Sequence, residues 1–67
     1  MEAGEKAIVR LRHWMSHNVH HQEEYEKVAA DLEAAGQTAS AAQIREMVVL
    51  SKRSTECLEK ALEALEP

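Results

Sequence analysis

The 67-residue sequence contains no phenylalanine, one cysteine, two glycines and a single proline, which is its last residue. With so few proline and glycine residues, little interrupts a helix, and residues that favour helices, such as alanine, glutamate, leucine and lysine, dominate the chain. The lone Cys57 excludes an intrachain disulfide and indicates either a reducing compartment or a free thiol. The sequence therefore predicts an all-α protein without an internal disulfide.

The sequence also lacks a basic excess and a long apolar run. Its 12 acidic residues outnumber its 8 basic residues, which are dispersed, and this argues against a nucleic-acid-binding surface. No apolar run approaches the ~20 residues that cross a bilayer, and the N-terminus carries acidic residues where a signal peptide has basic ones. We expect a cytoplasmic protein with no membrane or nucleic-acid partner.

Two helices and a short turn account for the chain. Gly36 suits the left-handed residue that ends a helix, and Thr38 or Ser40 suits the N-cap of the next helix, with Ser40 and Gln43 forming a capping box. The sequence predicts a single domain at 1–67, with helix 1 at about 5–35, a turn at 36–38 and helix 2 at about 39–65.

A seam of positions spaced alternately four and three residues apart runs along each predicted helix, which is typical of coiled-coil packing. The predicted seam of helix 1 consists of Ala7, Leu11, Trp14, Asn18, His21, Tyr25, Val28 and Leu32. The predicted seam of helix 2 consists of Ser40, Ile44, Met47, Ser51, Ser54, Leu58, Ala61 and Leu65. Trp14 and Tyr25 are the expected core anchors. The two seams indicate an antiparallel helical hairpin with coiled-coil-like packing.

Both predicted seams become polar at the same height. Folding the chain about Gly36 places Asn18 and His21 opposite Ser51 and Ser54, where a simple core would have leucine. Buried polar groups are costly without partners, so this layer either holds a ligand, contains a water network or fixes the register of the helices by hydrogen bonds. The sequence leaves these alternatives open.

One side of the predicted hairpin is apolar, with Ile8, Met15, Val48 and Leu62 beside the seams. A lone hairpin would leave this side in water, and a chain of this length buries little surface on its own. We therefore expect a homodimer, most simply a four-helix bundle formed by two hairpins.

Four histidines lie within nine residues of helix 1, and glutamates follow them. Residues three and four positions apart are neighbours on a helix, so these side chains form a contiguous stripe. The stripe consists of His13, His17, His20, His21 and Glu24. Imidazole pairs with a carboxylate one turn on suit Zn, Ni, Fe or Mn. The stripe predicts a transition-metal site, completed by ligands from a second subunit or from helix 2, where Cys57 is a candidate.

Each of these residues also has an ordinary structural explanation. The histidines and glutamates can form a solvated face, His21 can be a core histidine with satisfied hydrogen bonds, and Cys57 can be a small buried hydrophobe. No catalytic motif accompanies the stripe. His17 or His21 could act as a general base oriented by Glu24, so the question of enzymatic activity stays open, but activity is not expected.

The stretch HWMSHNVHHQEEY resembles a family of small prokaryotic helical-hairpin domains with an HWxxHNxxH-type pattern, some of them appended to CooT-like nickel-binding accessory proteins. The residues that carry the resemblance are His13, Trp14, His17, Asn18, His21, Glu23, Glu24 and Tyr25. The resemblance covers most of the chain and implies a metal-related accessory role, with nickel as the suggested metal and no established reaction. It ranks His13, His17 and His21 above His20 as ligands.

A weaker resemblance is to hemerythrin-type cation-binding bundles, in which a His-x-x-x-Glu pair contributes to a di-iron site. His20 and Glu24 match that spacing, but helix 2 has no histidine, so only dimerisation would supply enough ligands. We expect a non-catalytic, metal-binding helical protein that handles metal, as a homodimer and with a protein partner in metal handling. The alternative is a structural or protein-interaction hairpin whose polar layer fixes the register without metal.

Overall fold

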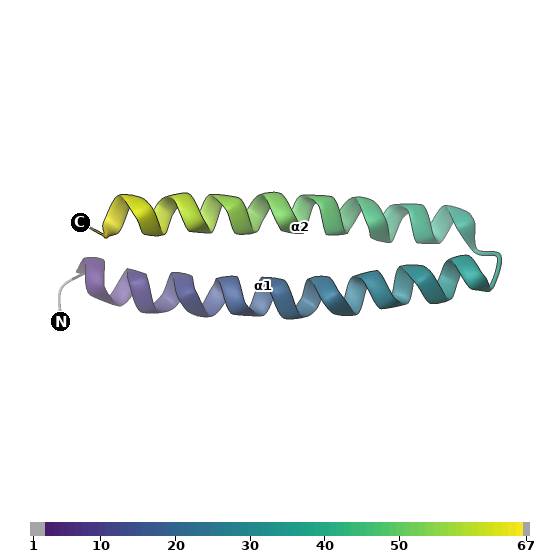
Figure 1. Ribbon diagram of the computed structural model, residues 1–67, viewed down its shortest axis with the longest axis horizontal. Coiled ribbons are helices and arrows are strands. Elements are labelled where there is room, and N and C mark those ends of the chain that lie inside the picture. Colours follow the sequence, from purple (N-terminus) through teal and green to yellow (C-terminus); the bar gives the residue numbers. More distant parts are fainter. Residues whose placement is uncertain (1–2, 67) are drawn as a thin grey trace.

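The computed structural model describes residues 3–66, which form two long helices, α1 (Ala3–Ala34) and α2 (Thr38–Leu65), joined by a short turn. Figure 1 shows the helices side by side, with the start of α1 next to the end of α2 and the turn at the far end. The all-α fold and the packing of two helices against each other are confirmed. The expected ranges, 5–35 and 39–65, differ from the observed ends by at most two residues.

The end of α1 adopts the glycine motif that the sequence predicts. Gly36 has a φ of 80°, in the left-handed region. The backbone N–H of Gln37 donates to the carbonyl of Leu32 at 2.8 Å, and that of Gly36 donates to the carbonyl of Glu33 at 3.0 Å. These two bonds form the Schellman motif, in which a residue with a Cβ would be strained at the position of Gly36.

The start of α2 differs from the prediction. Gln37 is the N-cap residue, and its side chain makes no capping hydrogen bond, so Thr38 and Ser40 lie inside α2. The backbone N–H of Ala41 donates to the carbonyl of Gln37 at 3.0 Å, which begins the helical bonding. The reason is the tightness of the turn, because the Schellman motif brings the chain into α2 before Thr38 or Ser40 can act as a cap.

Burial recurs at spacings of three and four along both helices, but the observed seam is rotated from the predicted one. The buried or half-buried residues of α1 are Gly4, Ala7, Ile8, Leu11, Met15, Asn18, Gln22, Tyr25, Ala29 and Leu32. Those of α2 are Ala41, Ile44, Val48, Ser51, Thr55, Leu58 and Leu62. About every second residue of each predicted seam is therefore buried or half-buried as expected. At most of the other positions, the next residue in the chain is buried instead.

The rotation moves three expected seam residues of α1 to the surface. Trp14 is 47% exposed, Val28 is 48% exposed, and His21 is also exposed. The prediction that Trp14 is a core anchor is wrong, and so is the placement of His21 in the core. Ala29, whose small side chain lets the helices approach closely, takes the place expected for Val28.

The same rotation brings the apolar side chains expected on an open flank into the hairpin. Val48 is only 6% exposed, and Ile8, Met15 and Leu62 are half-buried. Near the turn, Ala29 and Ala41 are fully buried because their small side chains let the helices approach closely. The expectation that Ile8, Met15, Val48 and Leu62 remain in water is therefore wrong, since they stabilise the contact between α1 and α2.

A polar layer crosses the middle of the seam. Asn18 Nδ2 donates to Ser54 Oγ at 3.3 Å, and Thr55 Oγ1 donates to the backbone carbonyl of Ser51 at 3.1 Å. Among residues 3–66, every buried side-chain nitrogen or oxygen has a hydrogen-bond partner. The contact between Asn18 and Ser54 agrees with the predicted register, whereas His21 lies outside the layer.

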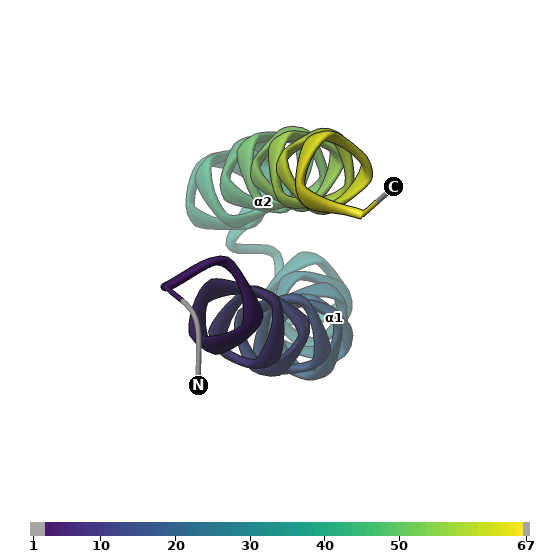
Figure 2. The ribbon, with the colours of Figure 1, turned by 90° about the vertical axis from the view of Figure 1, so that its left-hand side faces the viewer.

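The hairpin is long and thin. Its principal extents are 51 × 15 × 13 Å and its radius of gyration is 15.5 Å, against about 11 Å for a compact domain of this length. Figure 2, an end view, shows two helices crossing at a shallow angle with no further layer on either side. Neither described helix carries an apolar stretch long enough to span a bilayer.

The accessible surface is correspondingly large. It measures 5132 Å², whereas a compact protein of 7.5 kDa is expected to expose roughly 4,250 Å². Within the described part of the chain, only Ala29, Ala41 and Val48 are buried apolar residues. The hairpin thus leaves roughly 900 Å² more surface in water than a compact fold would.

Candidate metal centre

Three histidines form a continuous row on the exposed surface of α1. The ring centroids of His13 and His17 are 4.8 Å apart, and those of His17 and His21 are 5.3 Å apart. Both are i,i+4 pairs, which one turn of helix brings together. We call His13, His17 and His21 the histidine row. His17 is its centre and belongs to both pairs that could bind one ion.

Glu24 orients the end of the row. Its Oε1 lies 3.1 Å from His21 Nδ1 and 3.6 Å from His20 Nε2. When His21 carries its proton on Nδ1, Glu24 accepts that proton in a hydrogen bond and Nε2 is left free for a metal. The ring of His21 also stacks on Tyr25, with centroids 6.0 Å apart and planes at 12°. Two neighbours therefore hold this imidazole in place.

His20 lies apart from the histidine row. Its ring centroid is 6.1 Å from that of His21, and its side chain is 75% exposed. Adjacent residues point in different directions on a helix, so His20 and His21 are poorly placed to share an ion. His20 can instead pair with Glu24, which is its i,i+4 neighbour.

One hairpin does not complete a metal site by itself. Across residues 3–66, no three histidine, cysteine, aspartate or glutamate side chains gather so that they could hold a metal ion. His13 and His21 are two turns apart, roughly 12 Å along the axis. Cys57, the candidate ligand from helix 2, is an exposed thiol on α2. The row offers pairs of imidazoles, and a zinc-type site needs further donors.

One flank of the hairpin is closed by charge. Three ion pairs join α1 to α2 or to Glu66, the C-cap residue of α2, and we call this surface the ion-pair flank. The pairs are Arg12 with Glu66 at 2.6 Å, Glu26 with Lys52 at 3.8 Å, and Glu33 with Arg45. All six side chains are partly exposed, so each pair contributes little to stability but satisfies this surface in water.

The opposite flank is apolar and carries histidine. We call it the Trp14 flank, and it consists of Trp14, His21 and Val28 on α1 with Met47, Ser54 and Ala61 on α2. Trp14, Val28 and Met47 are 47%, 48% and 37% exposed. His17 and Glu24 belong to the next row outward on α1, because they lie three or four residues from Trp14 and His21. In the described residues, no ion pair joins the two helices on this flank.

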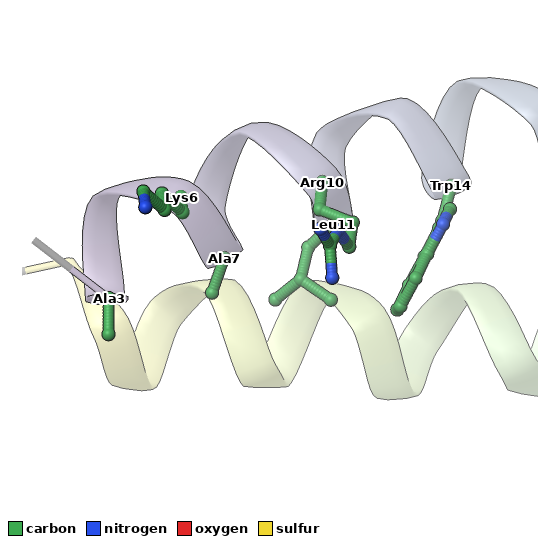
Figure 3. Close-up of a pocket in the computed structure, with 6 residues that line it drawn as sticks. All are labelled: Ala3, Lys6, Ala7, Arg10, Leu11 and Trp14. Carbon is green, nitrogen blue, oxygen red and sulfur yellow. The ribbon is translucent and has the colours of Figure 1, made fainter. Parts of the chain in front are cut away.

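A hollow of about 340 Å³ lies at the open end of the Trp14 flank. It is lined by Ala3, Lys6, Ala7, Arg10, Leu11 and Trp14. Figure 3 shows Ala7, Leu11 and Trp14 extending toward α2. Lys6 and Arg10 add two positive charges to an otherwise apolar surface. Sequence reasoning missed this hollow, although the i,i+4 spacing of Lys6, Arg10 and Trp14 was a signal that could have revealed it.

The comparisons with known proteins identify a family. Residues 7–65 match the model of a family described as a domain of unknown function, DUF8180. The match runs from the first turns of α1 to the last residue of α2. It therefore includes the histidine row, the Trp14 flank and all of the ion-pair flank except Glu66. No curated protein and no solved structure matches the chain.

Proposed function

We propose that this chain, which belongs to the DUF8180 family, binds a divalent transition metal through the histidine row of α1 and serves a non-catalytic metal-handling or accessory role. The observation that carries the proposal is the position of His17, whose ring lies 4.8 Å from that of His13 and 5.3 Å from that of His21. Each i,i+4 pair presents two imidazole nitrogens to one ion. Nickel, zinc and iron are the metals that this donor set suits.

Glu24 supports the same proposal from the end of the row. Its carboxylate lies within hydrogen-bonding distance of His21 Nδ1, at 3.1 Å. A metal-binding histidine usually donates its second ring N–H to such a carboxylate, which fixes the ring and strengthens the ligand. Glu24 either plays this orienting role for His21 or supplies an oxygen ligand beside His20.

We also propose that the metal-binding form is a homodimer, most simply a four-helix bundle. One hairpin supplies two imidazoles to an ion, and a second copy supplies the missing donors. The excess surface of roughly 900 Å² per chain is close to the ~800 Å² that each partner buries in a standard interface. A protein partner that receives or delivers metal would use the same exposed row. The free thiol of Cys57 suits a reducing compartment, and the cytoplasm is the proposed location.

Thermal unfolding of chelator-treated protein tests the proposal. Nickel, zinc, iron(II) and manganese(II) are added one at a time, and calcium serves as a hard-cation control. We expect one transition metal to raise the midpoint more than the others, because a ligand that binds only the folded state stabilises it. His17→Ala should abolish the rise, since it removes the imidazole common to both pairs.

His20→Ala is the matched control for His17→Ala. It removes another exposed imidazole from the same helix but leaves the histidine row intact. If His20→Ala abolished the rise and His17→Ala did not, the site would be the pair of His20 and Glu24. If no metal changed the midpoint, the metal-binding proposal would be wrong.

The second candidate function is a protein-interaction hairpin that needs no metal. The exposed apolar side chains of the Trp14 flank and the excess surface favour it. In that case the hydrogen bond between Asn18 and Ser54 fixes the register, and the histidines are surface residues. Association that is unaffected by chelators and by His17→Ala, but is lost in Met47→Asp, would favour this function over metal binding.

A further inference from the structure

We infer that a second copy of this chain docks on the Trp14 flank with its α1 antiparallel to α1 of the first copy, about a two-fold axis close to His21. The docking follows from the shape and charge of the described surface. Its consequence for metal binding rests on the proposed function, because the axis gathers the histidine rows of both copies. The experiment below separates the docking from the metal binding.

The charge order along α1 makes this surface complementary to itself. The row just outside the Trp14 flank consists of Arg10, His17, Glu24 and Asp31, seven residues apart, and is basic at one end and acidic at the other. An antiparallel copy centred near His21 sets Arg10 opposite Asp31 of the second copy. It also sets His17 opposite Glu24 of the second copy. Two-fold symmetry repeats each pairing, so four favourable contacts form.

The apolar residues of the flank obey the same symmetry. Trp14 and Val28 are equally far from His21 on either side, so each faces the other across the axis. Both are about half exposed in the single hairpin, at 47% and 48%. The hollow beside Trp14 carries Lys6 and Arg10, and it lies where Asp31 of the second copy would enter (Figure 3). A concave, basic surface thus meets an acidic helix end.

The other surfaces are poorer candidates for the interface. The ion-pair flank has already paired its charges within the hairpin, and burying those pairs would require their desolvation. Elsewhere on the surface, the exposed apolar residues include Val9, Val19 and Val49. These are smaller than Trp14 and Met47 of the Trp14 flank or Leu50 in the row next to it. The Trp14 flank therefore offers the larger gain from burial.

The docking brings together ligands that one hairpin keeps apart. His21 of each copy lies next to the axis, and each His17 faces Glu24 of the other copy. Four imidazoles and two carboxylates then surround the axis, which is a sufficient donor set for a transition metal. The dimer supplies the further donors that the described part of a single chain lacks.

A charge swap tests the docking without metal. The association constant of chelator-treated protein is measured by sedimentation equilibrium for wild type, Arg10→Asp, Asp31→Arg and the double variant. We expect each single change to weaken the dimer roughly tenfold, because it creates two like-charge contacts. The double variant should regain most of the wild-type affinity. Lys60→Asp, an equal charge change on the outer face of α2, should leave the affinity unchanged, and helix content is checked by circular dichroism throughout.

Two results would overturn the docking. One is a chain that stays monomeric at all accessible concentrations. The other is a dimer in which the double variant is as weak as the single variants, since α1 would then face α2 of the second copy and Arg10 would not meet Asp31.

The same assay with nickel or zinc added tests the metal part. We expect the metal to tighten the wild-type dimer. His17→Ala should lose this tightening when its dimer with metal is compared with its own chelated dimer, which is itself weaker because the contact with Glu24 of the second copy is gone. A charge swap that behaves as expected, with no metal effect, would overturn the proposed function and leave the docking intact. Metal binding to a monomer would overturn the docking and the proposed homodimer, but it would leave metal binding by the histidine row intact.

Discussion

The two flanks of the hairpin differ in how many of their side chains find partners within a single chain. On the ion-pair flank, charged residues of α1 pair with charged residues of α2 or its C-cap, from Arg12 and Glu66 at the open end to Glu33 and Arg45 near the turn. On the Trp14 flank, a tryptophan, a valine and a methionine are 37–48% exposed, and histidines lie beside them. The ion-pair flank has its charges paired within the monomer, whereas the Trp14 flank leaves apolar side chains in water.

This difference supports the proposal that the Trp14 flank and the histidine row beside it carry the function. Exposed ion pairs contribute little to the free energy of unfolding. They keep a surface hydrated, and burying them against a second copy would cost desolvation energy. Exposed aromatic and aliphatic side chains next to imidazoles form a surface that gains from burial and can bind metal at the same time. The following changes test this contrast, from the largest expected effect to the smallest.

The buried seam lies between the two flanks and holds α1 and α2 together. A charge in the seam should unfold the hairpin and so remove both flanks. Val48 is 6% exposed, and Val48→Asp would bury a carboxylate without a partner, which costs about 3 kcal/mol or more of unfolding free energy. Urea unfolding followed by circular dichroism measures the loss. Val49→Asp is the matched control, because its neighbour Val49 is 58% exposed and should tolerate the change. Equal losses in the two variants would show that the seam is placed wrongly.

Trp14→Ala tests the Trp14 flank directly. An exposed tryptophan at the centre of an interface contributes about 2 kcal/mol or more, so self-association should weaken by more than tenfold, while the helix content changes little. Val19→Ala removes a side chain of similar exposed fraction, 46%, that lies on the other side of the hairpin. Sedimentation equilibrium distinguishes the two, and an equal effect of both substitutions would contradict the assignment of the interface.

Asn18→Leu tests whether the polar layer serves specificity rather than stability. Among residues 3–66, the side chain of Asn18 bonds to Ser54 alone, at 3.3 Å, in a half-buried seam. An apolar residue there should therefore raise the unfolding free energy by about 1 kcal/mol. The gain should be accompanied by a broader range of oligomers in gel filtration, because the register loses its polar marker. A clear loss of stability would instead show that the hydrogen bond holds the hairpin together.

Lys52→Ala should have the smallest effect. Lys52 lies 3.8 Å from Glu26, and the two side chains are 59% and 52% exposed, so solvent screens the pair. We expect a loss of about 0.5 kcal/mol or less in low salt, which disappears in high salt. Urea midpoints at two ionic strengths measure it. A loss above about 1 kcal/mol would mean that the ion-pair flank stabilises the hairpin more than exposed ion pairs usually do.

The sequence was sufficient for the architecture because helix propensity and Gly36 depend on local chemistry. It was not sufficient for the rotation of the seam, because two neighbouring rows of each helix are almost equally apolar. The row with Trp14 and Val28 and the row with Met15 and Ala29 could each form the buried seam of α1. The close approach of the two helices at Ala29 and Ala41 selects the second row. The ion-pair flank depends on that rotation, so it could not be predicted either.

In the candidate site, too, the features set by local spacing could be predicted from the sequence, and those set by the packing of the helices could not. The neighbours of His17 on α1 follow from the i,i+4 spacing alone, and the observed ring distances of 4.8 and 5.3 Å agree with it. The stacking of His21 on Tyr25, its i,i+4 neighbour, follows from the same spacing. The exposure of His21 depends instead on how α2 packs against α1, which the spacing does not contain. Whether the row binds metal is a property of the molecule in solution, and it stays a prediction.

Calorimetric titration of chelator-treated protein with nickel and with zinc tests the central claim most directly. The account predicts saturable binding of at least one of these metals, its loss in His17→Ala and its retention in His20→Ala. Binding should also weaken as the pH falls through the range in which imidazoles take up protons, since a protonated ring cannot bind metal. Absence of binding by the wild type, or equal binding by wild type and His17→Ala, would contradict a metal centre at the histidine row.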